Sequence, residues 1–158
     1  TKRASKLAPH DTVELQGPFG VFTTDESEKP IVMLAAGIGV TPLLCMTRDL
    51  IDRKSDREII FFYSNKTVED ISYFERLKEM TKMYPKLKVV YTLTQKTYEG
   101  WDGETGRVDG EMLKKHVSDL NGAVYYLCGP SGFMDSIKEF LENEGVNIKD
   151  CVNQERFD

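Results

Sequence analysis

Four runs of apolar residues divide the chain at regular intervals. They are IVMLAA from Ile31, IIFFY from Ile59, LKVVYTL from Leu87 and AVYYLC from Ala123. Within each run the apolar residues are continuous rather than alternating, which is typical of strands that are covered on both faces. Each run therefore predicts a buried strand of a parallel sheet.

The segments between these runs have the spacing of amphipathic helices. The expected apolar faces are Leu43, Leu44, Thr47, Leu50 and Ile51; Ile71, Phe74, Leu77 and Met80; Met112, Leu113, His116, Val117 and Leu120; and Phe133, Met134, Ile137, Phe140 and Leu141. Gly145 is placed to end the last helix in a left-handed conformation. Strands that alternate with helices predict an α/β fold: a doubly wound, five-stranded parallel sheet with helices on both faces.

The beginning of the chain departs from this pattern. Thr12 to Gln16 reads TVELQ, a short alternating strand, and GPFG and a polar link from Thr23 to Pro30 follow it. We therefore expect residues 1–24 to be the tail strand and linker of a preceding β domain, and residues 25–158 to form the α/β domain. The first residue is Thr1 rather than Met, so we expect a piece of a longer polypeptide.

Composition narrows the possible partners. The 21 Lys and Arg residues stand against 26 Asp and Glu, and no segment concentrates basic residues, which argues against nucleic acid. The longest apolar stretches fall far short of the roughly 20 residues that a membrane helix needs. Three widely spaced cysteines and two histidines form neither a disulfide framework nor a metal cluster. We expect a cytoplasmic protein without a metal site.

Candidate chemistry lies where strands meet helices, because ligands of open parallel sheets bind beyond the carboxyl ends of the strands. At the first junction, AAGIGVTP, Gly37 and Gly39 let the backbone approach a ligand, Thr41 can cap the helix and Pro42 suits its first turn. A diphosphate would fit here, and a side chain at Gly39 would fill its space. The loop is not the GxGxxG fingerprint, so a tight, well-capped glycine turn is an open alternative.

The fourth junction, CGPSGFM, repeats this arrangement with Gly129, Gly132 and Pro130 at a helix start. Cys128 is expected to hold its thiol over the same crevice and to contact a bound ring. Buried, inert cysteines are common, so a core position is the alternative.

The other two junctions are less specific. After the second run, Thr67 and Asp70 resemble a capping box, which we favour over a ligand-binding role. After the third run, a long loop from Thr97 to Arg107 contains Trp101, and loops of this length often have a function. We favour Trp101 as a hydrophobic plug over the sheet edge.

Taken in order, AAGIGVTP, YSNKT, ETGRV, YLCGPSGFM and a terminal ERF resemble the nicotinamide-binding domain of the ferredoxin-NADP reductase superfamily. The resemblance spans nearly the whole chain, and TVELQGPFG resembles the end of that family's flavin-binding barrel. It implies that residues 1–24 end a flavin domain. The family's flavin-anchoring signature, Arg-x-Tyr-Ser or Arg-x-Tyr-Thr, is absent from this sequence. The isolated chain is therefore expected to bind nucleotide weakly and to carry no flavin.

The resemblance also implies a set of site residues. The dinucleotide diphosphate would lie at Gly37, Ile38, Gly39 and Val40, with Thr41 and Pro42 beside the nicotinamide. Cys128 would lie against the carbon that gives up hydride, Glu155 would help to hold the transfer geometry, and Phe157 would cover the flavin ring. The implied catalytic residues are Cys128, Glu155 and Thr41; the remaining coenzyme-binding residues are Asn65, Thr94, Gln95, Gly129 and Pro130.

The implied function is hydride transfer from NADH or NADPH to FAD, or to FMN, and then electron transfer to a carrier protein, a metal centre or an iron-sulfur module. Phosphate-preferring relatives carry a Ser-Arg pair where this chain has Thr94 and Gln95, so NADH is favoured, although Lys66 and Lys96 stand close enough in sequence to replace the Arg. A nucleotide-sensing or docking subunit without catalysis is one alternative. A convergent α/β phosphate binder is another.

Overall fold

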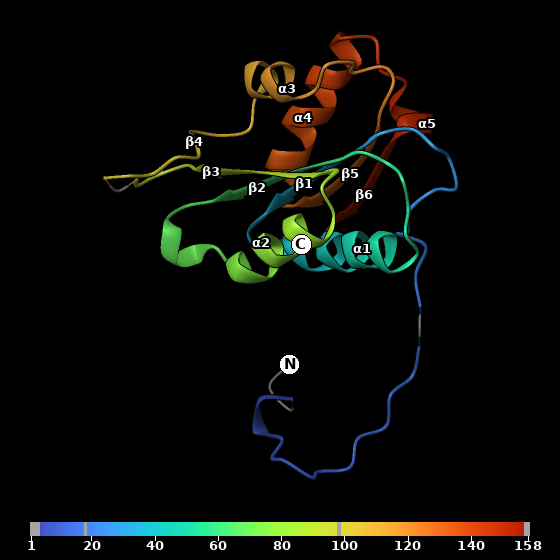
Figure 1. The fold of residues 1–158 in the computed structure, drawn as a ribbon, viewed down its shortest axis with the longest axis vertical. Coiled ribbons are helices and arrows are strands. Elements are labelled where there is room, and N and C mark those ends of the chain that lie inside the picture. Colours follow the sequence, from blue (N-terminus) through green and yellow to red (C-terminus); the bar gives the residue numbers. More distant parts are fainter. Residues whose placement is uncertain (1–3, 18, 98, 157–158) are drawn as a thin grey trace.

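The computed structural model describes residues 4–17, 19–97 and 99–156. In this part of the chain, a six-stranded sheet lies between two layers of helices (Figure 1). The strands are β1 (Ile31–Ala36), β2 (Ile59–Asn65), β3 (Leu87–Leu93), β4 (Glu104–Thr105), β5 (Val124–Gly129) and β6 (Val152–Arg156). The helices are α1 (Val40–Asp52), α2 (Phe74–Met83), α3 (Gly110–His116), α4 (Ser131–Asn143) and α5 (Ile148–Cys151), with short 3₁₀ turns η1 (Ala4–Lys6), η2 (Gly37–Gly39) and η3 (Val68–Asp70).

The strands follow the order β4-β3-β2-β1-β5-β6, and each neighbouring pair is parallel. The chain builds outward from β1 to β4 on one side and then returns to place β5 on the other side of β1. The carboxyl ends of β1 and β5 therefore form the switch point at which such sheets bind ligands. The predicted parallel α/β class is confirmed. The sheet has six strands rather than the predicted five, because two edge strands, β4 and β6, flank the four strands that the apolar runs indicated, and their residues are mostly exposed.

Two apolar cores cover the two faces of the sheet. Helices α1 and α2 pack against one face, which includes Met33, Phe61 and Tyr126. Helices α3 and α4 pack against the other, which includes Leu34 and Phe62. Consecutive residues of a strand point to opposite faces, so burial on both sides requires the continuous apolar runs seen in the sequence.

The four expected helices form, but two are shorter than expected, and the short helix α5 was not predicted. Helix α2 begins at Phe74, so Ile71 lies before it, after η3. Helix α3 ends at His116, short of the expected Leu120, because Val117 has an extended backbone that leads the chain toward β5. Val117 is nevertheless buried, and Leu120 packs against the same core. Gly145 follows α4 with a φ of +84°, as expected for a left-handed helix end.

The segment before Phe22 runs away from the sheet and the helices (Figure 1). Residues Thr12–Gln16 form no strand in this structure and are exposed, so their pairing within a preceding domain stays a prediction. A strand requires a neighbour to complete its hydrogen bonds, and the described residues offer none there. No helix in the described ranges has both the length and the apolar character needed to cross a bilayer.

Candidate functional site

A cavity of about 900 Å³ opens at the carboxyl edge of the sheet. The ends of β1, β2, β3 and β5 contribute Ala36, Asn65, Thr94 and Gly129 to its walls. The segments that begin α3 and α4 complete them. The volume is typical of a small-molecule or cofactor site, and the location is the one expected for an open parallel sheet.

The turn after β1 forms one wall of the cavity through Gly37 and Ile38. Gly37 has a φ of +54°, which favours glycine, and a Cβ atom there would meet no neighbour within 4 Å. The predicted cap at Thr41 is wrong, since Gly39 occupies the N-cap position of α1. The Thr41 hydroxyl instead donates a hydrogen bond of 3.0 Å to the carbonyl of Ile38, and so braces the turn.

Gly39 has a different role from the one the sequence suggested. It is buried, and a Cβ atom there would lie 2.1 Å from the carbonyl oxygen of Cys128 and 2.9 Å from the amide nitrogen of Gly129. A side chain at position 39 would therefore collide with the backbone of β5 rather than fill the cavity. This close packing brings the two glycine loops together around one hollow.

The loop after β5 forms the opposite wall through Gly129, Pro130, Gly132 and Phe133. Pro130 is the N-cap residue of α4, and its carbonyl accepts hydrogen bonds from the amides of Phe133 and Met134 at 3.0 and 3.2 Å. The N-terminus of this thirteen-residue helix faces the cavity. Its partial positive charge favours an anionic group there.

Asn65 supplies the most specific polar group of the cavity. The residue is 5% exposed, and the nitrogen and oxygen of its side-chain amide form no hydrogen bond of ordinary geometry among the described residues. The amide does lie near the buried Tyr63 hydroxyl, whose pKa it lowers against the larger, opposite effect of burial. Its backbone carbonyl is occupied, because it accepts bonds from the amide and the hydroxyl of Thr94 at 2.9 and 3.2 Å. An unpaired buried amide costs about 1–3 kcal/mol, so this side chain fits a ligand that pairs with it.

Charged groups also line the cavity. Asp70 accepts hydrogen bonds from the backbone amide and the hydroxyl of Thr67, both at 3.1 Å, so the capping box is confirmed. Asp109 caps α3 by accepting a bond from the amide of Met112 at 2.9 Å. The described residues form no ion pair with Lys66 or Arg107, which leaves these two cations available to an anion.

Arg107 is the site residue that sequence reasoning missed. It belongs to the ETGRV turn that supported the family resemblance and closes the long loop after β3, but its residue type alone gives it no role. Arg107 reaches the cavity because the end of the loop pairs with β3 as strand β4, two residues before Arg107. At the other end of the loop, Trp101 is half-buried near the sheet edge, and its indole N–H donates to the carbonyl of Glu104 at 2.9 Å, consistent with the expected plug.

The Cys128 thiol does not overhang the crevice, contrary to expectation. Its side chain is fully buried in the core under α1 and is not among the cavity-lining groups. Side chains alternate along a strand, so the residues that follow Cys128 face the cavity instead. Burial, together with the negative charge of Glu155, raises the pKa of the thiol to about 11.

Glu155 lies opposite Cys128 in the ladder between β5 and β6, and it is exposed. Phe157 lies outside the described residues. Of the predicted coenzyme-binding residues, the structure gathers Gly37, Ile38, Asn65, Thr94, Gly129 and Pro130 around the cavity. It places Gly39, Val40, Thr41, Pro42, Gln95 and Cys128 behind or beside its walls. Among the described residues, no group of three His, Cys, Asp or Glu side chains could hold a metal ion.

Comparison with known proteins identifies the class of fold and site. Residues 33–139 match the family model of the oxidoreductase NAD-binding domain. NADH-cytochrome b5 reductase 1 of Mortierella alpina is 29% identical over 98% of this chain, and a flavohemoprotein of Bacillus subtilis is 26% identical over 96% of it. The cytochrome b5 reductase domain of Ulva prolifera nitrate reductase superposes with a TM-score of 0.84 at 28% identity, covering 98% of this chain and 64% of that one.

The chain therefore belongs to the oxidoreductase NAD-binding domain family, in the ferredoxin-NADP reductase superfamily that its motifs indicated. It spans 52% of the Mortierella reductase and 38% of the Bacillus flavohemoprotein. Each of these relatives thus contains a large part that has no counterpart here.

Proposed function

We propose that this chain is the NAD(P)H-binding domain of a flavin-dependent reductase. The coenzyme would occupy the cavity at the switch point of the sheet and would reduce FAD, or FMN, held by a domain upstream in the same polypeptide. The observation that carries this proposal is the buried, unpaired Asn65 amide in a cavity framed by two glycine loops.

The walls of the cavity offer neutral hydrogen-bond donors, which can bind a dinucleotide without a patch of basic side chains. The turn at Gly37 and Ile38 and the N-terminus of α4 supply backbone N–H groups for a diphosphate. The Asn65 amide can both donate to and accept from a hydroxyl or carboxamide group. These neutral donors explain how a chain with a net charge of −5 could bind an anionic coenzyme.

We place the nicotinamide at the Cys128 and Glu155 end of the site, next to Thr41. When bound, the reduced nicotinamide supplies a hydride, two electrons and one proton, to the flavin, which then passes electrons on singly. The protein's task is alignment, since the reacting atoms must come within about 3–3.5 Å. Because its pKa is raised, the Cys128 thiol stays neutral at physiological pH in the core beneath this end of the site.

An upstream flavin domain is supported by the exposed apolar side chains before Phe22. Leu15, Phe19 and Val21 are 89%, 84% and 96% exposed, which is costly unless another surface covers them. Cys45, Cys128 and Cys151 are free, which suits a reducing compartment such as the cytoplasm. A carrier protein, a metal centre or an iron-sulfur module would receive the electrons.

NADH is the coenzyme that we propose as favoured, because Thr94 and Gln95 replace the Ser-Arg pair. Lys66 and Arg107 add cations to the cavity wall, so NADPH would also be accepted.

Stopped-flow absorbance of the polypeptide that includes the upstream segment tests the proposal. The account predicts that NADH bleaches a bound flavin. A longer polypeptide that binds NADH without any flavin signal would contradict the reductase function and favour a nucleotide sensor.

A further inference from the structure

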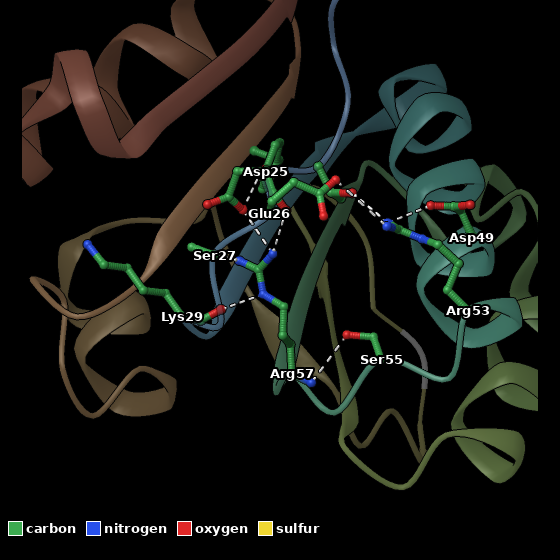
Figure 2. A network of polar contacts seen from close by, with 10 residues as sticks. Asp25, Glu26, Ser27, Lys29, Asp49, Arg53, Ser55 and Arg57 are labelled. Carbon is green, nitrogen blue, oxygen red and sulfur yellow. Dashed lines mark hydrogen bonds and ion pairs between the residues drawn. The ribbon is translucent and has the colours of Figure 1, made fainter.

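Arg57, which stands just before β2, is committed to the segment that enters the domain (Figure 2). Its Nε donates to the carbonyl of Lys29 at 2.6 Å, and its Nη1 donates to the carbonyl and the carboxylate of Asp25 at 3.1 and 2.8 Å. Its Nη2 reaches the Ser27 hydroxyl at 3.4 Å. The side chain is only 8% exposed. Each nitrogen of the guanidinium therefore binds the linker 22–29, the segment from Phe22 to Lys29.

Other groups hold the same linker from the sheet and from α1. The Tyr126 hydroxyl donates to the Asp25 carboxylate at 3.1 Å and accepts from the Asp25 amide at 2.7 Å. The Phe22 ring packs edge-on against the Tyr126 ring, with centroids 6.1 Å apart. Arg53, which follows α1, donates to the Thr24 hydroxyl at 3.1 Å. We call Arg57, Tyr126 and Arg53 the linker clamp.

The clamp contains a charge pair in which the Arg57 side chain is buried and the Asp25 side chain is 35% exposed. Burial alone would raise the pKa of Asp25, but hydrogen bonds from Ser27, Arg57 and Tyr126 and the charge of Arg57 lower it. Removing one partner of such a pair leaves the other charge poorly compensated. A linker that served only as a tether would not need a nearly buried arginine and a carboxylate to fix its backbone.

Arg57 and Lys29 precede β2 and β1, so their contact lies at the amino edge of the sheet, opposite the edge that carries the cavity, and Tyr126 in β5 links the clamp to the strand that leads to the site. Tyr126 precedes Cys128 by two residues in β5, so both side chains lie on the same face of the sheet and in the same core. The linker thus crosses the sheet face that carries the Cys128 thiol. The exposed apolar residues of the upstream segment directly precede Phe22, where the linker begins.

We propose that Arg57 is a positioning residue, whose grip on Asp25, Ser27 and Lys29 sets how the upstream flavin domain stands relative to the nicotinamide end of the cavity. This inference rests on the proposed function. None of the hydrogen bonds and ring contacts of the clamp described above involves a cavity-lining residue, so the clamp would act on the geometry of hydride transfer and not on coenzyme affinity. A displacement of about 1 Å can cost roughly 100-fold in rate.

Two variants of the polypeptide that includes the upstream domain test the proposal. Tyr126→Phe removes only the hydroxyl that holds Asp25, and Arg57→Gln removes the charge and most of the donors. Both are expected to reduce the bound flavin at least about tenfold more slowly at saturating NADH, with the Kd for NADH within about twofold of wild type. Arg48→Gln is the control, because Arg48 pairs only with Asp52 on the surface of α1.

Hydrogen exchange of residues 22–29 supplies a second readout that needs no flavin. Both variants should lose protection in this segment, whereas Arg48→Gln should keep it. If Tyr126→Phe exchanges like wild type, the hydroxyl does not hold the linker and the clamp is wrong. If protection falls while the folded variant reduces flavin at the wild-type rate, the positioning role is wrong. Failure of the wild type itself to reduce flavin would instead contradict the proposed function, and the exchange data would still decide whether the clamp exists.

Discussion

Gly39 packs against the carbonyl of Cys128 so closely that a Cβ atom at position 39 would lie 2.1 Å from that oxygen. The contact joins the turn after β1 to the end of β5, the two strands at the switch point of the sheet. Both glycine loops therefore border a single hollow. The missing side chain at Gly39 sets the distance between them.

Gly39→Val should destabilise the fold, because a Cβ atom and two methyl groups must displace the backbone of β5. We expect the free energy of unfolding to fall by about 1–3 kcal/mol or more. Gly132→Ala is the matched control: a Cβ atom there meets nothing within 4 Å, and alanine favours the helix. Urea unfolding of both variants measures the difference, and equal stability of Gly39→Val and wild type would contradict the close packing.

The raised pKa of Cys128 predicts a pH dependence of stability. The pKa of the thiol is near its ordinary value of 9.0 in the unfolded chain, but burial raises it to about 11 in the folded one. The stability that it contributes is thus present below pH 9 and is lost as the pH rises through 11. The gap in unfolding free energy between wild type and Cys128→Ala should narrow between pH 8 and pH 11. Both proteins contain the same tyrosines, so the contributions of these groups cancel in the difference between the two unfolding free energies. A difference that stays constant with pH would show that the pKa of the thiol is not raised by folding.

Cys128→Ser tests the role assigned to this residue in the polypeptide that includes the flavin domain. The exchange keeps the size of the side chain roughly constant but replaces a polarizable sulfur with a hydroxyl. The thiol lies in the core and lines no part of the cavity, so the exchange can act only through the β5 backbone that leads to Gly129 in the cavity wall. We therefore expect the rate of flavin reduction to fall more than the affinity for NADH. Stopped-flow reduction at the wild-type rate would remove Cys128 from the mechanism and leave it a core residue.

The apolar runs predicted β1, β2, β3 and β5 almost to the residue, because strands buried on both faces need uninterrupted apolar side chains. Edge strand β4 was not predicted because its two residues are polar: Glu104 is half-buried and Thr105 is exposed. The alternating TVELQ segment forms no strand here, because alternation indicates that a segment can pair with another strand, and the described residues place no strand beside it.

The glycine loops were visible in the sequence, but the direction of each side chain was not. Cys128 lies at the right place along the chain, yet the alternation of β5 turns its thiol into the core. The residue type of Arg107 did not indicate a role in the site, since surface arginines in loops are common. Its place in the site follows from the long loop that returns beside β3.

Arg107→Gln tests the choice of coenzyme. A hydrogen bond to a charged group is worth about 1.5–3 kcal/mol, so loss of the guanidinium should weaken NADPH binding about tenfold or more. NADH lacks the 2′-phosphate and should lose less than about threefold. The comparison uses the Kd of both coenzymes for both proteins, and an equal loss for the two would show that Arg107 does not face the phosphate.

Calorimetric titration of this chain with NADH tests most directly whether the cavity at the carboxyl edge holds a reduced pyridine dinucleotide. The account predicts saturable binding to wild type and to the surface control Asn121→Ala. Asn65→Ala should bind at least about tenfold more weakly while the unliganded protein is as stable as wild type or more so, because the unpaired amide is gone. Undiminished binding by Asn65→Ala, or saturation by ATP with no response to NADH, would contradict it.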